Sequence, residues 1–150
     1  MQNFRRDLLI GKKAENTFAN YLIKSKVSEL IVVMDGMWKW FDIFDFTNNI
    51  TYEVKNDSWT KETGNICIEL WSHKKLQHPG WIKYTTADYL IYFISDDEYL
   101  KIPMQTIKDY INIPENLKGK RKVNGWSKGN TNVENILIPY ILFTNEILKV

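Results

Sequence analysis

Three charged side chains between residues 41 and 57 have the types and spacing for hydrolytic chemistry. Asp42 is followed after ten residues by Glu53, and Lys55 stands two residues beyond Glu53. Carboxylate oxygens suit Mg²⁺, which commonly takes one or two protein carboxylates and completes its shell with waters and phosphate oxygens. A lysine beside that ion could orient or help deprotonate an attacking water and stabilise negative charge in a transition state. The segment therefore contains the parts of a metal-dependent hydrolytic site.

The strands that would carry these residues form a predicted β-meander. Residues 30–34 are a short β-rich run, and Asp35-Gly36 is a strong signal for a two-residue hairpin. Residues 37–46 then form the second predicted strand. Asn48-Asn49 is the expected second turn because asparagine tolerates positive φ, and residues 50–55 complete the meander.

The register of the second hairpin decides which acidic residues lie together. A turn centred on Asn48-Asn49 places Asp42 opposite Lys55 and Asp45 opposite Tyr52. Directly opposed residues share a face of a sheet, as do residues two apart along one strand. We therefore expect Asp42, Glu53 and Lys55 on one face, and Asp45 on the other.

This cluster has a functional and a structural interpretation. In the functional one, Asp42 and Glu53 bind a divalent metal, the Val54 carbonyl adds a third ligand, and Lys55 lies beside the ion. In the structural one, Asp42 and Lys55 are a cross-strand ion pair on a solvated face, worth less than about 1 kcal/mol. The pair would then only set the strand register of a structural protein.

An amphipathic helix is predicted over residues 4–24, ahead of the meander. Glu15 falls near the middle of its apolar stripe, where an unpaired charge is costly. One interpretation is that Glu15 points inward and contributes to the site; the other is that it reaches out to solvent or to Lys12. The stripe comprises Phe4, Leu8, Gly11, Phe18, Ala19 and Leu22.

The later part of the chain continues the mixed pattern. Residues 66–71 alternate as a strand, with Glu69 on the face opposite Ile66, Ile68 and Leu70. Residues 89–94 read as a buried strand and 98–102 as an edge strand, followed by a helix that begins near Pro103. Residues 133–148 could form strand or helix, although Pro139 argues against an uninterrupted helix.

The bulk properties fit one globular domain of 150 residues. A net charge of +2 does not demand a nucleic-acid partner, but residues 118–128 carry five basic residues and no acid. That stretch is either a phosphate-contacting loop or a solvated surface loop.

Cys67 is the one cysteine, which excludes an internal disulfide and fits a reducing cytoplasmic setting. No apolar run approaches the roughly 20 residues of a membrane span. Most of the abundant aromatic residues are expected to fill the core rather than to stack on bases.

Asp42 followed by Glu53-Val54-Lys55 across a hairpin resembles the motif of the PD-(D/E)xK nucleases. This superfamily includes restriction endonucleases, Holliday-junction resolvases and phage exonucleases. The resemblance covers roughly residues 4–95 and includes the helix glutamate, the meander and the strand in TTADYLIYF. It implies a single α/β nuclease-like domain over residues 1–150. The expected fold is a restriction-endonuclease-like core, in which a mixed β-sheet is flanked by helices and an N-terminal helix precedes the meander.

The resemblance also implies an activity, a cofactor and a set of site residues. The expected activity is Mg²⁺- or Mn²⁺-dependent hydrolysis of DNA phosphodiesters, as in an endonuclease of the recombination, junction or restriction type. The alternative is a catalytically inactive DNA- or protein-binding module of the same fold. A chain this small favours a homodimer where two strands must be cut. The implied catalytic residues are Asp42, Glu53, Lys55 and Glu15, the implied metal ligands are Asp42, Glu53, Val54 and Glu15, and Glu69 is a weaker accessory candidate. The candidate DNA-contacting residues of the basic stretch are Lys118, Lys120, Arg121, Lys122 and Lys128. Lys74, Lys75 and Lys83 are further candidates, although lysines of this kind are more often just solvated.

Overall fold

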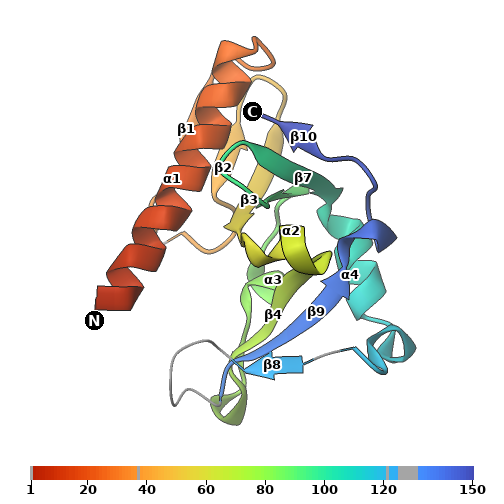
Figure 1. Cartoon of the computed structure of the whole chain (residues 1–150). Helices are drawn as coiled ribbons and strands as arrows, with labels where there is room; N and C mark the ends of the chain where they lie inside the picture. Colours follow the sequence, from red (N-terminus) through yellow and green to blue (C-terminus); the bar gives the residue numbers. More distant parts are fainter. Residues whose placement is uncertain (1, 37, 121, 125–131) are drawn as a thin grey trace.

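The computed structural model describes residues 2–36, 38–120, 122–124 and 132–150 of the chain (Figure 1). Arg121 and Lys128 of the predicted basic loop lie outside these ranges. The chain is of the mixed α/β class, as the sequence predicts, with a mixed sheet as its largest element. The order of its strands is β1 (Ile31–Val33), β2 (Ile43–Asp45), β3 (Ile50–Asn56), β6 (Tyr89–Phe93), β7 (Glu98–Pro103) and β10 (Leu148–Lys149).

Neighbouring strands in this sheet are antiparallel except at its centre, where β3 and β6 run parallel. Parallel neighbours need a crossover connection, and here the crossover contains two of the four strands of a second sheet. The second, antiparallel sheet has the order β5 (His78–Pro79), β4 (Asn65–His73), β9 (Glu134–Pro139) and β8 (Lys122–Asn124). The helices are α1 (Gln2–Lys24), α2 (Trp59–Thr63), α3 (Trp81–Tyr84) and α4 (Met104–Ile111), with 3₁₀ turns η1 (Lys74–Leu76), η2 (Pro114–Leu117) and η3 (Tyr140–Leu142).

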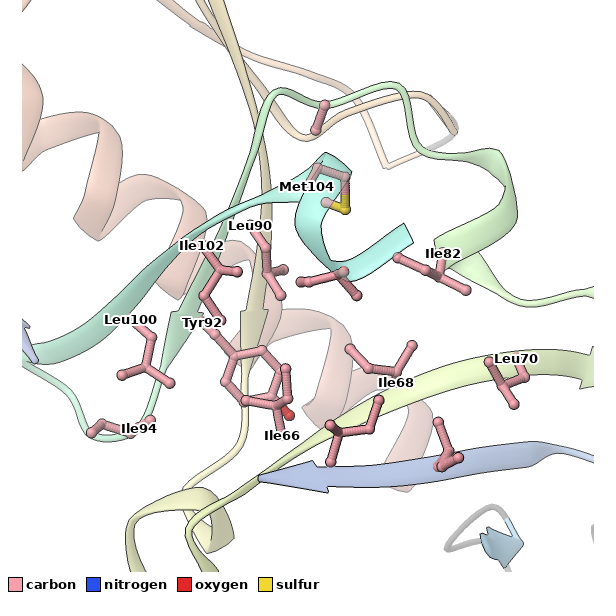
Figure 2. Packing of buried hydrophobic residues seen from close by; sticks show 14 residues of the cluster. Ile66, Ile68, Leu70, Ile82, Leu90, Tyr92, Ile94, Leu100, Ile102 and Met104 are labelled. Carbon is pink, nitrogen blue, oxygen red and sulfur yellow. The ribbon is translucent and has the colours of Figure 1, made fainter. Parts of the chain in front are cut away.

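Strand β6, at the centre of the six-stranded sheet, is buried on both faces. Ile91 and Phe93 pack in the cluster beneath α1, whereas Leu90 and Tyr92 pack in the cluster shared with the second sheet (Figure 2). A strand covered on both sides reads as a continuous apolar run, which explains the sequence YLIYF. The predicted buried strand at this position is therefore confirmed.

The helix α1 lies along one face of the six-stranded sheet (Figure 1). Phe18, Ala19 and Leu22 of the predicted stripe are buried there, together with Ala14. Leu8 of the same stripe is 59% exposed. The predicted stripe is therefore only partly a core face, because its N-terminal half extends past the sheet. No helix in the described ranges is long and apolar enough to cross a membrane.

The meander is present, but its first connection differs from the prediction. Ile31 pairs with Asp45 and Val33 with Ile43, so residues 34–42 connect β1 to β2 and no two-residue hairpin forms at Asp35-Gly36. The predicted second strand shortens to Ile43–Asp45. A contact between residues far apart in sequence outweighs the turn preference of Asp35-Gly36. The Trp40 carbonyl accepts the Thr86 N–H at 2.7 Å.

The second turn is close to its predicted place. Asn49 has φ 55°, the left-handed conformation that asparagine tolerates. The register nevertheless differs by two residues, since Asp45 pairs with Ile50 rather than with Tyr52. A shift of two residues keeps every side chain on its face, because the side-chain period of a strand is two. Asp42 and Asp45 therefore lie on opposite faces of the sheet, as predicted, although the predicted register was wrong.

Candidate functional site

Two carboxylates and one ammonium meet where β2 and β3 lie side by side. The Lys55 Nζ lies 2.5 Å from Glu53 Oε1 and 3.7 Å from Asp42 Oδ2. Asp42 is fixed just before β2, because its N–H donates to the Tyr52 carbonyl at 2.8 Å and its Oδ2 accepts the Val54 N–H at 2.7 Å. The strands thus hold the three predicted side chains in one cluster, which we call the carboxylate–lysine cluster.

Burial and mutual charge set the protonation of this cluster. Burial of Glu53, whose side chain is 6% exposed, raises its carboxyl pKa, and the charge of Asp42 adds to that rise against the opposing effect of Lys55. Burial alone would lower the pKa of Lys55, but the charges of Glu53 and Asp42 outweigh it and raise that pKa. Lys55 is therefore held as an ammonium ion.

The cluster opens into a pocket of about 570 Å³ that is lined by residues of both sheets and of α3. Asp42, Glu53 and Lys55 line it together with Glu69, and Trp38, Lys39, Trp81 and Tyr84 form aromatic and basic walls. We call this the cluster pocket. The pocket gives the cluster access to solvent and to a ligand.

Glu69, the weaker accessory candidate, lies on β4 and lines the cluster pocket. Its Oε1 accepts the backbone N–H of Trp81 at 3.3 Å, so it ties α3 to the second sheet. Gly80, immediately before Trp81, makes the approach close enough for this contact: a Cβ on Gly80 would meet the Glu69 carbonyl oxygen at 2.1 Å. The glycine is therefore needed to seat Trp81 against β4, and the Trp81 ring then lies 5.1 Å from the Lys55 Nζ.

Glu15 lies on α1, which covers the opposite face of the sheet from the cluster pocket, and it does not line that pocket. Its carboxylate pairs with Lys12 at 2.9 Å, and the Lys12 Nζ also donates to the Met34 carbonyl at 2.8 Å. Burial raises the Glu15 pKa despite Lys12, and the charge of Asp42 adds to the rise. Glu15 therefore interacts with the cluster through its electric field, while its direct partner is Lys12.

The predicted basic residues lie mainly away from the cluster pocket. Lys83 and Lys122 line a different pocket, on the side of β4 that faces α4, and Lys83 lies 3.5 Å from the centre of the Trp71 ring. Lys74 and Lys122 both form ion pairs with Glu134. The remaining described candidates sit at the surface around short turns: Lys75 is exposed in η1, Lys118 is exposed after η2, and Lys120 is half-buried.

The cluster offers a metal ion few protein ligands. Within residues 2–36, 38–120, 122–124 and 132–150, no group of three His, Cys, Asp or Glu side chains is close enough to hold an ion. Mg²⁺, however, commonly takes only one or two protein carboxylates, with waters for the rest. Asp42 and Glu53 already direct one oxygen each at a shared cation, the Lys55 ammonium. The cluster therefore fits a hard, water-rich ion and does not fit a closed site of protein ligands.

Several pocket residues were missed by the sequence analysis. Trp38 and Lys39 belong to the run MWKWF, which the meander prediction placed inside a strand. Trp38, Trp40 and Trp59 are exposed, although most of the described aromatic residues are buried in the core or packed against it, as expected. The available signal was Trp38-Lys39-Trp40 itself, in which two tryptophans flank a basic residue.

Cys67 provides no alternative nucleophile near this site. Partial burial, with the charges of Asp57 and Glu69, raises its thiol pKa to about 11. A thiol with that pKa stays protonated at neutral pH and is a poor nucleophile. The chemistry of the region therefore depends on carboxylates, an ammonium and bound water.

Known proteins offer no further assignment. No protein-family model matches the chain, and no curated protein matches it at a significant level.

Proposed function

We propose that the chain is a metal-dependent deoxyribonuclease that hydrolyses DNA phosphodiester bonds at the carboxylate–lysine cluster. The observation that carries the proposal is the meeting of Asp42, Glu53 and Lys55 at the head of an open pocket. An isolated surface ion pair would need one carboxylate, whereas here two carboxylates compete for one ammonium. The order of elements adds support, since a helix, a meander and a parallel neighbour of β3 follow one another along the chain.

In this proposal Asp42 and Glu53 hold Mg²⁺ or Mn²⁺. The Val54 carbonyl and Glu15 remain proposed further ligands from the family resemblance, Glu15 less directly because its carboxylate pairs with Lys12. When bound, the ion would polarise the phosphate and lower the pKa of a coordinated water. The partly raised pKa of Glu53 means that the ion competes with a proton for this carboxylate.

Lys55 acts in this proposal as a donor rather than as a base. Its raised pKa keeps it protonated at neutral pH, so it has no lone pair with which to accept a proton. In phosphodiester hydrolysis, a water oxygen bonds to phosphorus while one P–O ester bond breaks and the leaving oxygen gains a proton. The Lys55 ammonium would orient that water and stabilise the negative charge that develops on the phosphoryl oxygens.

A second candidate is a catalytically inactive module of the same fold that binds DNA or protein. The observation that favours it is the Lys55 ammonium, which already neutralises Glu53 at 2.5 Å. In that case the cluster would bind no divalent ion. The two candidates therefore differ in a property that can be measured directly, the affinity for Mn²⁺.

The test combines cleavage with metal binding. Purified protein is incubated with linear duplex, nicked, branched and single-stranded DNA in Mg²⁺, in Mn²⁺ and in EDTA. Mn²⁺ binding is measured in parallel by calorimetry on wild type and on Asp42→Asn. Metal-dependent cleavage with Mn²⁺ binding that Asp42→Asn weakens supports the nuclease. Absence of cleavage on every DNA form refutes it, and absence of Mn²⁺ binding as well favours the inactive module.

A further inference from the structure

A further pocket, of about 610 Å³, lies apart from the carboxylate–lysine cluster. No described residue lines both this pocket and the cluster pocket, so the proposed hydrolysis makes no use of it. Its volume falls within the range of about 300–1,000 Å³ that is common for small-molecule sites. We call it the lysine pocket, because Lys83, Lys108 and Lys122 all line it.

The lysine pocket carries more positive charge than its acidic residue can neutralise. Glu134 is the one acid among the described residues that line it. Glu134 pairs with Lys122 at 3.8 Å and also with Lys74, which does not line the pocket. Lys83 and Lys108 form no ion pair with a carboxylate in the described parts of the chain. The pocket therefore presents two ammonium groups that have no negative partner there.

The groups that contact these two ammonium ions are neutral. The Lys108 Nζ donates to the Thr85 carbonyl, and the Lys83 Nζ lies 3.5 Å from the centre of the Trp71 ring. Lys108 is half-buried, so its charge is partly removed from water without gaining an opposite charge. The attraction between opposite charges strengthens as water is excluded, which favours an anion beside such an ammonium. Lys83 and Lys108 therefore indicate an anionic ligand.

Much of the remaining wall is apolar. Leu70 of β4 and Ile82 of α3 are buried side chains that line the pocket. Ile111, at the end of α4, and Leu117, at the end of η2, are half-buried there. Covering such side chains with apolar ligand atoms is favourable in proportion to the area removed from water. A bare phosphate would leave this wall unused, so the pocket suits a ligand with an apolar body and an anionic head.

We propose that the lysine pocket binds a small organic acid in which one anionic head group is attached to an apolar chain or ring. The head group pairs with Lys83 and Lys108, and the apolar body packs against Leu70, Ile111 and Leu117. An apolar body alone would leave Lys108 without a negative partner, and a head group alone would leave the apolar wall in water. This site is independent of the proposed function, because the two pockets have no described lining residue in common.

The first test uses the wild-type protein alone. The probe is anilinonaphthalene sulfonate, an apolar aromatic anion whose fluorescence rises when it leaves water, and calorimetry gives its stoichiometry. We expect one probe molecule to bind per chain, and octanoate to displace it. Octylammonium has the same chain with the opposite charge, and acetate has the same head group with almost no chain. Neither should displace the probe at the concentration at which octanoate does.

Substitutions then locate the head group. Lys108→Met and Lys83→Met each remove a charge but keep a long unbranched side chain. Lys108→Met should weaken probe binding at least about fivefold, and Lys83→Met about two- to fivefold, because the exposed Lys83 is more fully screened by water and salt. Lys101→Met is the matched control and should bind the probe like wild type. Lys101 also lies against an aromatic ring, 4.3 Å from the centre of Tyr89, but it does not line the lysine pocket.

The possible results distinguish an organic-acid site from simpler surfaces. Equal displacement by octylammonium would show only an apolar surface, and equal displacement by acetate would show only a charged one; either result overturns the proposal. Probe binding that neither Lys108→Met nor Lys83→Met weakens in the folded protein also overturns it. If duplex DNA displaces the probe and octanoate does not, these lysines belong to a DNA-contacting surface and the proposal is wrong. The wild-type comparison is decisive even if a variant fails to fold, and no readout depends on DNA cleavage.

Discussion

Asp42 and Asp45 lie three residues apart in one hairpin, and the structure gives them opposite surroundings. Asp45 is 0% exposed and points beneath α1, where it accepts hydrogen bonds from the Ser28 hydroxyl at 2.5 Å and the Asn48 side-chain amide at 2.8 Å. Asp42 lies on the other face, in the cluster pocket, with Lys55 3.7 Å away. The same residue type is thus a closed structural centre in one place and an open charged site in the other.

The difference shows how burial and hydrogen bonding determine the pKa and the role of a carboxylate. Burial would raise the pKa of Asp45, but hydrogen bonds from Asn48 and Ser28 outweigh it and lower that pKa. Glu53, beside Asp42, has a raised pKa because burial is less fully compensated. A carboxylate whose bonds are complete stabilises the fold, whereas one whose charge is incompletely compensated is available to bind a cation.

The largest effect is expected on catalysis, from substitutions in the carboxylate–lysine cluster. Lys55→Ala and Glu53→Gln should each reduce the rate of DNA cleavage by at least about 100-fold, because each removes a group that stabilises transition-state charge or holds the metal. The rate is measured with saturating Mg²⁺ on the DNA form that the wild-type protein cleaves best. Asp45→Asn is the matched control and should retain most of the activity, since Asp45 faces away from the pocket. A wild-type rate for both Lys55→Ala and Glu53→Gln would show that the cluster is not the site.

The next effect is on stability, and here Asp45 should matter more than Asp42. Asp45→Ala leaves the buried Ser28 hydroxyl and the Asn48 backbone N–H without their acceptor, so it should lower the free energy of unfolding by about 1–3 kcal/mol. Asp42→Ala should cost less, because its side chain is partly solvated. Urea unfolding followed by circular dichroism measures both. A larger loss for Asp42→Ala would reverse the proposed division between the two residues.

The dependence of stability on pH should have opposite signs at the two positions. Asp45 has a lowered folded pKa, so its contribution is complete above the ordinary value of 3.8 and is lost as pH falls below it. Glu53 has a raised folded pKa, so its contribution is complete below 4.5 and is lost as pH rises through its folded pKa. Unfolding free energies of wild type, Asp45→Asn and Glu53→Gln across this range measure the two slopes. Matching slopes for the two variants would contradict the comparison.

The smallest effect is expected at Glu15, which combines features of both aspartates. Glu15→Gln removes an ion pair with the half-exposed Lys12 but also relieves the cost of burying a charge. We expect a change of less than about 1 kcal/mol in the free energy of unfolding. If Glu15 contributes to the metal shell, the same variant should need more Mg²⁺ for half-maximal cleavage. An unchanged Mg²⁺ requirement would restrict Glu15 to its pair with Lys12.

The sequence predicted the face of each charge better than it predicted the hairpins. The side-chain period of two kept Asp42 away from Asp45 although the pairing register was shifted by two residues. The prediction of a tight turn at Asp35-Gly36 was wrong because the Trp40 carbonyl accepts the Thr86 N–H, a contact between residues far apart in sequence. Local patterns cannot report such contacts.

The walls of the pockets were harder to predict for the same reason. The strand 66–71 was recognised, but nothing in its alternation indicated that Glu69 would meet Trp81. That meeting depends on the close approach of Gly80 to the backbone of β4. Asn135 likewise lines a second pocket beside Lys55 and Glu69 only because β9 pairs with β4 across a long stretch of chain.

The crossover between β3 and β6 has a consequence for how this chain could diversify. The carboxylate–lysine cluster belongs to β3 and the residue before β2, whereas Glu69 and Trp81 belong to the crossover itself. The crossover includes the β4–β5 hairpin, whose η1 end is exposed. Because the entropic cost of a loop grows slowly with its length, that end can accept insertions at little cost in stability. Selection could therefore reshape which ligands enter while the reacting groups stay fixed.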